Sequence, residues 1–266
     1  MLQQTQVERV IPLFEAFVAV FPGFAALAAA GTGDVLRLWR GLGYNTRALR
    51  LHALAGAVVE RHAGRLPSER EALLALPGIG PYTAAAVRAF AFDLDDVALD
   101  TNLRRIVHRT RLGIEYPAQA SDRELDELAR AEAPAGSSHD WNSAMMDVGA
   151  TICTARAPKC LLCPLREACA AAPIDAKALA ELSLRFGRRT TPQESIPFER
   201  TTRFLRGRIV DRLRDVPNGS TVGLAELIAS LDGVVPTDRM SEISGVTDAL
   251  VRDGIVVRAG DELRLA

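Results

Sequence analysis

All four cysteines of this 266-residue chain lie in one short segment, and their spacing suits a metal centre. They are Cys153, Cys160, Cys163 and Cys169, in the pattern C-x6-C-x2-C-x5-C. Four thiols this close together, in a chain without an export signal, favour metal ligation over disulfides. Four thiolates can hold a zinc ion or an iron–sulfur cluster. The residues alone therefore predict a metal centre and leave the metal open.

A second stretch could bind an anion. The segment Leu-Pro-Gly-Ile-Gly-Pro-Tyr-Thr-Ala at 76–84 places Gly78 and Gly80 between two helical patterns. Glycine tolerates the positive φ of a tight turn, and Pro81 suits the first position of the helix that follows. The N–H groups of the two glycines and of the first helical turn would then face outward, where the helix dipole favours a phosphate. An ordinary corner between two helices is the alternative.

A carboxylate follows on the next loop. Asp100 precedes a helix expected over 101–112, and as its N-cap it would stabilise that helix by ~1 kcal/mol. Capping fixes the direction of the carboxylate, so the same group can also act on a substrate. Its neighbours Asp93, Asp95 and Asp96 are interpreted as solvated loop charges.

The hairpin, Asp100 and the cysteine spacing together resemble the helix-hairpin-helix DNA glycosylases, the superfamily of endonuclease III and MutY. The resemblance covers residues 1–172. It implies that hairpin amides grip one DNA strand, that the Asp is essential, and that the four cysteines hold a [4Fe–4S] cluster. Bifunctional members carry a nucleophilic Lys where this chain has Tyr82, and a Tyr cannot form a Schiff base. A monofunctional glycosylase is therefore implied.

Further segments resemble the MutY-type adenine glycosylases within that superfamily. Met-Leu-Gln-Gln-Thr-Gln at 1–6 is similar to a signature whose Leu and second Gln wedge into the duplex beside the flipped base. Gly-Leu-Gly-Tyr at 41–44 is similar to a loop whose Tyr inserts next to 8-oxoguanine. Residues 141–150 also resemble MutY. The implied DNA contacts are Leu2, Gln3, Gln4, Tyr44, Gly78, Gly80 and Thr83, and the implied catalytic residues are Asp100, Tyr82 and Asn102.

The resemblance implies base excision repair, in which adenine mispaired with 8-oxoguanine or guanine is removed by hydrolysis of the N-glycosidic bond of a flipped nucleotide. Asp100 would stabilise an oxocarbenium-like sugar. Departure of adenine needs a general acid at N7. The family's catalytic Glu stands two positions before Met-Leu-Gln-Gln and would precede Met1. Tyr82, with an ordinary pKa near ~10, is a poor replacement. We favour a translation start upstream of Met1, because everything downstream keeps the pattern; without that Glu the chain would be inactive.

Two other functions stay open. A thymine glycosylase acting on T·G mismatches is compatible with Tyr82 and Asp100, although the Met-Leu-Gln-Gln-Thr and Met-Met-Asp segments argue against it. A non-catalytic mismatch-binding protein is the second, and it gains weight if Met1 is the true start.

The expected fold is mostly α, a helix-hairpin-helix glycosylase fold with a C-terminal winged-helix-like α+β domain. At the C-terminus, three helical patterns precede two alternating segments around Ala259-Gly-Asp261, which is a hairpin signal. MutY usually ends instead in a Nudix-like domain that recognises 8-oxoguanine, and no counterpart is visible. The expected parts are a six-helix domain at 1–98 with the hairpin motif at 69–90, a cluster domain at 99–172, a linker at 173–200 and the winged-helix-like domain at 201–266.

Composition sets limits on the partners. The chain has 32 basic and 33 acidic residues, a net charge of -1 and no apolar run long enough to span a bilayer. Because the chain has no excess of basic residues, a DNA-binding surface must come from local clusters of basic side chains. We expect a cytoplasmic, nucleoid-associated monomer that binds double-stranded DNA containing a mismatch or an oxidised guanine, with no membrane contact.

Overall fold

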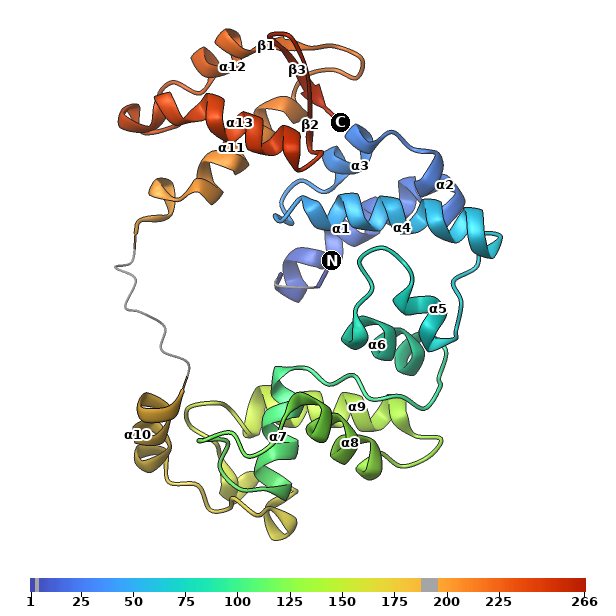
Figure 1. The fold of residues 1–266 in the computed structure, drawn as a ribbon, viewed down its shortest axis with the longest axis vertical. Helices are drawn as coiled ribbons and strands as arrows, with labels where there is room; N and C mark the ends of the chain where they lie inside the picture. The colour runs from blue at the N-terminus through green and yellow to red at the C-terminus, as the bar shows by residue number, and fades with distance from the viewer. Residues whose placement is uncertain (3–4, 188–195) are drawn as a thin grey trace. The chain divides into compact units, whose positions relative to one another are not determined.

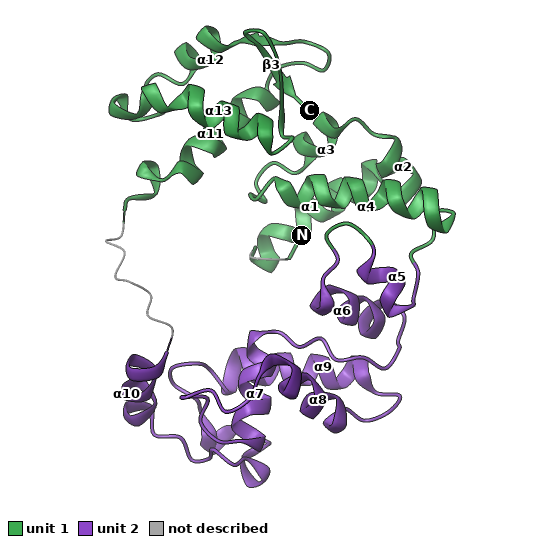
Figure 2. Ribbon diagram, in the orientation of Figure 1, with its two compact units in different colours: residues 1–66, 76–78, 193–266 green, residues 67–75, 79–192 purple. Residues whose placement is uncertain are grey.

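The computed structural model describes residues 1–2, 5–187 and 196–266, and the chain is mostly helical (Figure 1). Contacts divide it into two compact units (Figure 2): a first unit of residues 1–66, 76–78 and 193–266, and a second of residues 67–75 and 79–192. The expectation of a mostly α fold is confirmed. In the described part of the chain, no helix is long and apolar enough to cross a membrane.

Four helices form the N-terminal part of the first unit. They are α1 (Val7–Val20), α2 (Phe24–Ala29), α3 (Thr32–Leu38) and α4 (Thr46–His62). Trp39, just after α3, is 2% exposed, and its ring meets Phe17 of α1 edge-on with the centroids 6.1 Å apart. Helix α4 ends at Ala63 in the left-handed conformation, which lets the next N–H bond back to Val58.

The C-terminal part of the first unit has the element order of a winged helix. Its elements are α11 (Thr202–Arg214), β1 (Val222–Gly223), α12 (Leu224–Ser230), α13 (Ile243–Arg252), β2 (Val256–Ala259) and β3 (Glu262–Leu265), with short 3-10 turns at Phe198–Arg200 and Thr237–Glu242. The strands form an antiparallel sheet in the order β1-β3-β2, with Val222 opposite Leu263 and Val256 opposite Leu265. The winged-helix-like expectation is confirmed.

The N-terminal helices and the winged-helix-like part share one hydrophobic core. Buried Leu205 and Ile209 of α11 belong to the same cluster as Leu36 and Trp39. Arg37 of α3 donates a hydrogen bond of 2.9 Å to the carbonyl oxygen of Val216. Residues 1–66 and 201–266 are therefore tied together across a long sequence separation. The domain boundaries expected at 98, 172 and 200 stay predictions.

The second unit carries Asp100, the cysteines and the two helices that flank the hairpin, whose residues 76–78 belong to the first unit. Its helices are α5 (Arg70–Leu74), α6 (Pro81–Ala91), α7 (Thr101–Arg111), α8 (Asp122–Glu132), α9 (Ser138–Asp147) and α10 (Ala176–Phe186), with a π-helical turn at Val148–Ile152 and 3-10 turns at Cys160–Leu162 and Arg166–Ala168. Helix α7 packs against α8 and α9 around a core that includes Leu103, Ile106 and Leu125. Because α7 begins directly after Asp100, this core fixes the carboxylate's backbone.

Candidate active site and cysteine loop

The glycine hairpin has the local geometry of an anion site, with the positive φ confined to one glycine. Gly78 has φ 79°, whereas Gly80 is extended and stands at the N-cap of α6. Pro81 occupies the first turn, as expected, and no side chain caps the helix. A Cβ on Gly80 would meet nothing within 4 Å. The first-turn N–H groups, including that of Thr83, are therefore open to an external acceptor.

Asp100 caps α7 and is held by two hydrogen bonds. Its Oδ1 accepts from the Leu103 N–H at 2.7 Å, and its Oδ2 accepts from Nδ2 of Asn102 at 3.2 Å. The side chain is half-buried. The carboxylate therefore has a fixed direction and keeps access to solvent.

Asn102 is in turn held by Arg105, a residue that the sequence interpretation missed. Nη2 of Arg105 donates to Oδ1 of Asn102 at 2.9 Å and to the Gly149 carbonyl oxygen at 2.8 Å. Nε of Arg105 donates to the Cys153 carbonyl oxygen at 2.8 Å. The signal in the sequence is that Asn102 and Arg105 stand three residues apart in a helical pattern, which places both side chains on one helix face. A continuous chain of hydrogen bonds thus joins Asp100 to the backbone of the first cysteine.

Gly149 lets the π-helical turn approach α7 closely. A Cβ on Gly149 would lie 2.7 Å from the Cβ of Asn102 and 3.2 Å from Cδ1 of Ile106. Real Cβ atoms do not tolerate the shorter distance, so a side chain here would displace Asn102. Such π-helical turns are frequent at functional sites.

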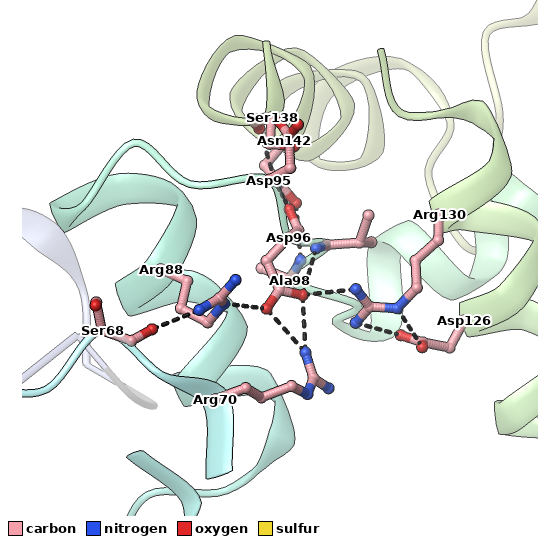
Figure 3. A network of polar contacts seen from close by, with 11 residues as sticks. Ser68, Arg70, Arg88, Asp95, Asp96, Ala98, Asp126, Arg130, Ser138 and Asn142 are labelled. Carbon is pink, nitrogen blue, oxygen red and sulfur yellow. Dashed lines mark hydrogen bonds and ion pairs between the residues drawn. The ribbon is translucent and has the colours of Figure 1, made fainter. Parts of the chain in front are cut away.

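Asp96 anchors the loop before Asp100, and its interpretation as a solvated charge is wrong. The residue is 4% exposed. As Figure 3 shows, its carboxylate accepts from Nη1 of Arg70 (2.8 and 2.9 Å), from Nε of Arg88 (2.9 Å) and from Nη1 of Arg130 (2.8 Å). Burial alone would raise the pKa of Asp96, but the hydrogen bonds from Arg130, from the Val97 N–H and from Arg70 hold it below its ordinary value. One buried anion therefore joins α5, α6 and α8.

Asn142 fastens the same loop to α9. It is 0% exposed. Its Oδ1 accepts from the Ala98 N–H at 2.9 Å, and its Nδ2 donates to the carbonyl oxygens of Asp96 (2.9 Å) and Ser138 (2.7 Å), as seen in Figure 3. Asp95 is exposed, as expected for a loop charge, and it also accepts from the Gly136 N–H and from Oγ of Ser138. The backbone leading to Asp100 is therefore pinned by side chains from three directions.

Tyr82 lies in the first turn of α6 and is 42% exposed. Partial burial, and then the negative charge of Asp100, raise the pKa of Tyr82 above its ordinary value. The phenol is thus a neutral hydroxyl over the physiological range. It can donate a hydrogen bond, but it is a weak acid.

In the first unit, the Tyr44 loop has an unusual backbone. Gly41 and Gly43 have φ of 90° and 67°, and Tyr44 itself has φ 45°, a region that side chains rarely adopt. Tyr44 is 44% exposed and Leu2 is 59% exposed. Gln3 and Gln4 lie outside the described residues. Strained backbone of this kind is often kept at functional sites.

The four cysteines line a single cavity. None of the four is in a disulfide, and Arg109 and Lys159 also line the cavity. Arg109 is fully buried; it donates to both oxygens of Glu115 at 2.7 and 2.6 Å and to Sγ of Cys153 at 3.5 Å. Burial would lower the pKa of Arg109, but its bonds to Glu115 and Cys153 raise it. A buried arginine, paired with Glu115, therefore lies beside the thiols.

The four thiols suit a metal centre in ligand type and in number. Among the residues that the structure describes, no three His, Cys, Asp or Glu side chains converge as ligands of one metal ion would. A four-thiolate zinc site needs all sulfurs around one point. In a [4Fe–4S] cluster each thiolate binds a different iron, so the sulfurs stand around a larger body. Four thiols around one cavity supply the ligand type and number of either arrangement.

Comparison with known proteins assigns the family. Residues 1–131 match the model of the HhH-GPD superfamily of base excision DNA repair proteins. The chain is 38% identical to adenine DNA glycosylase of Mycolicibacterium smegmatis over 261 residues, which cover 98% of this chain and 83% of that protein. The chain belongs to the adenine DNA glycosylase family. The human adenine DNA glycosylase is also 38% identical, over 64% of this chain and 32% of its own length.

Solved structures agree with this family at the level of the fold. A thermostable thymine-DNA glycosylase matches with a TM-score of 0.58 and 31% identity, covering 64% of this chain and 78% of that one. Endonuclease III in a non-covalent DNA complex matches with a TM-score of 0.55 and 23% identity, covering 63% of this chain and 77% of that one. The helix-hairpin-helix glycosylase fold expected from the sequence is confirmed.

Proposed function

We propose that this protein excises adenine from duplex DNA, where adenine is mispaired with 8-oxoguanine or guanine, by hydrolysing the N-glycosidic bond of a flipped nucleotide. The observation that carries this proposal is the Asp100 carboxylate. It is held by the Leu103 N–H and by Asn102, while it keeps access to solvent. A fixed carboxylate stabilises the oxocarbenium-like sugar without having to reorganise.

In this proposal the enzyme breaks the N-glycosidic bond and does not go on to cleave the DNA strand. Tyr82 stands where bifunctional relatives carry an amine nucleophile, and a phenol cannot form a Schiff base. Its raised pKa makes it a hydrogen-bond donor to the site and not the acid that protonates adenine. The roles given to Tyr82, Asn102 and Asp100 are part of the proposal.

DNA binding is proposed to start at the hairpin. The uncapped first turn of α6, with Gly78, Gly80 and Thr83 around it, offers N–H groups to a phosphate. Leu2, Gln4 and Tyr44 would enter the duplex, with Gln3 beside them. The protein would act as a monomer on mismatched or oxidised double-stranded DNA in the cytoplasm, at the nucleoid.

The cysteines are proposed to hold a [4Fe–4S] cluster. Cys153, Cys160, Cys163 and Cys169 would supply the four thiolates, and the cluster would cross-link the loop that they frame. Anaerobically purified protein should be brown and contain about four irons per chain. A colourless protein with one zinc would refute this assignment. Cys169→Ser should lower the iron content and destabilise the loop.

The test of the function is single-turnover base release. Duplexes with A·8-oxoguanine, A·G and T·G are compared, using protein that begins at Met1 and protein that also carries any in-frame residues encoded upstream. Adenine release from the first two duplexes, abolished by Asp100→Asn, supports the proposal. Release from T·G alone supports thymine excision, which the thymine-DNA glycosylase match keeps as second candidate. Binding without any release would favour a mismatch-binding protein.

A further inference from the structure

The Tyr44 loop is held in its strained shape by side chains behind it. Nε1 of Trp39 donates to the Gly43 carbonyl oxygen at 3.1 Å. Nη2 of Arg47 donates to the carbonyl oxygens of Leu42 (2.8 Å) and Gly43 (3.3 Å). These bonds fix the backbone of the loop, while Tyr44 itself is 44% exposed.

The exposed ring is covered by an arginine from the winged-helix-like part. The guanidinium carbon of Arg203, near the start of α11, lies 4.5 Å from the centroid of the Tyr44 ring. Arg47 lies near the same ring at 5.7 Å. A guanidinium at this distance from an aromatic face is an attractive cation–π contact. The ring direction is therefore set partly by a residue 159 positions away in the sequence.

The charge on Arg203 is not neutralised by the protein. Within the described residues, its guanidinium has no hydrogen bond or ion pair, and the residue is exposed. Other arginines of the same region are paired: Arg200 with Asp238, Arg206 with Asp253, and Arg208 with Asp211. Arg203 therefore combines a contact on the Tyr44 ring with a guanidinium that is available for an outside anion.

The contact is rigidly supported. Helix α11 shares a core with α3, and Arg214 at its other end is 8% exposed. Nε of Arg214 donates to the Leu36 carbonyl oxygen, and its Nη2 donates to Oδ1 of Asn45, both at 2.9 Å. Helix α11 therefore holds both the residue that follows Tyr44 and the Tyr44 ring.

We propose that Arg203 is a specificity-determining residue of the enzyme: it positions the Tyr44 ring and offers its charge to a phosphate of the DNA strand opposite the adenine. This inference rests on the proposed function. It assigns a role in DNA recognition to the winged-helix-like part. Recognition of the opposite base would then be shared between the two ends of the chain.

The test compares Arg203→Ala with the matched control Arg206→Ala on the same helix. For A·8-oxoguanine, Arg203→Ala should weaken binding about three- to fivefold and lower the ratio of base release from A·8-oxoguanine to that from A·G. The slope of log affinity against log salt should fall by about one, because one phosphate contact is lost. Arg203→Lys should keep the salt slope of the wild-type protein but lower the ratio of base release from A·8-oxoguanine to that from A·G. Arg206→Ala should change neither.

A double-mutant cycle with Tyr44→Leu separates positioning from a general effect of charge. If Arg203 acts through the ring, the two substitutions together should cost clearly less than the sum of each alone. The proposal would be overturned if the two substitutions were strictly additive. It would also be overturned if Arg203→Ala stayed within twofold of Arg206→Ala, both in DNA binding and in the ratio of base release from A·8-oxoguanine to that from A·G. Circular dichroism confirms that each variant is folded. If the wild-type protein releases no adenine, the proposed function fails, and binding to the A·8-oxoguanine duplex alone still decides the role of Arg203.

Discussion

Asp96→Asn should be among the most damaging conservative substitutions in the second unit. The carboxylate is 4% exposed and accepts from three arginines and from the Val97 N–H. An amide has one accepting oxygen, and its NH₂ group would face guanidinium donors. At least two charge-assisted bonds are lost, each worth about 1.5–3 kcal/mol, so we expect a loss of about 3–5 kcal/mol in the free energy of unfolding.

Asp126→Asn is the matched control. Asp126 binds Arg130, the same arginine that binds Asp96, but its side chain is 34% exposed and that of Arg130 is 35% exposed. Such a half-exposed pair contributes about 0–1 kcal/mol. Chemical denaturation followed by circular dichroism measures both losses, and hydrogen exchange of the amides at 96–103 localises them. Base release should fall more than DNA affinity, because the loop carries Asp100.

The dependence of stability on pH gives a sharper check of the role of Asp96. Because the pKa of Asp96 is lowered in the folded protein, its stabilisation is fully present above the unfolded value near ~3.9 and disappears as pH falls through the lowered pKa. The difference between wild type and Asp96→Asn should therefore be constant at neutral pH and shrink below about pH 4. Equal losses for Asp96→Asn and Asp126→Asn at neutral pH would refute the assignment of Asp96 as the anchor.

Two further predictions follow from the same unit. Gly149→Ala should lower the free energy of unfolding by about 1–3 kcal/mol through overpacking. It should also slow base release with little change in DNA affinity, because the new Cβ displaces Asn102. The control is Gly207→Ala, whose Cβ would meet nothing and which should change neither stability nor base release. Stability or base release equal to that of Gly207→Ala would contradict this. Tyr82→Phe should leave the pH profile of base release between about 6 and 9 unchanged, since the raised pKa keeps the phenol neutral there. A basic limb that vanishes in Tyr82→Phe would show that Tyr82 titrates in the reaction.

The sequence by itself determined the features that depend on short stretches of chain. The turn at Gly78, Pro81 in the first turn of α6 and the N-cap at Asp100 were all predicted, because each follows from the conformational limits of a few neighbouring residues. The helix expected over 101–112 is α7, and the C-terminal helices and hairpin appear where the periodicity placed them. The order of the motifs was enough to predict the family.

Only the tertiary structure decided which charged side chains are buried and which partners they contact. Asp96 sits in a polar loop sequence and was taken for a solvated residue, yet arginines that stand 26, 8 and 34 positions away surround it. The contact of Arg203 with Tyr44 joins the two ends of the chain in the same way. A buried carboxylate is stable only if cations converge on it, and convergence across helices depends on packing. Local sequence patterns carry no information about such partners, so the loop anchor and the Tyr44 contact emerged only from the fold.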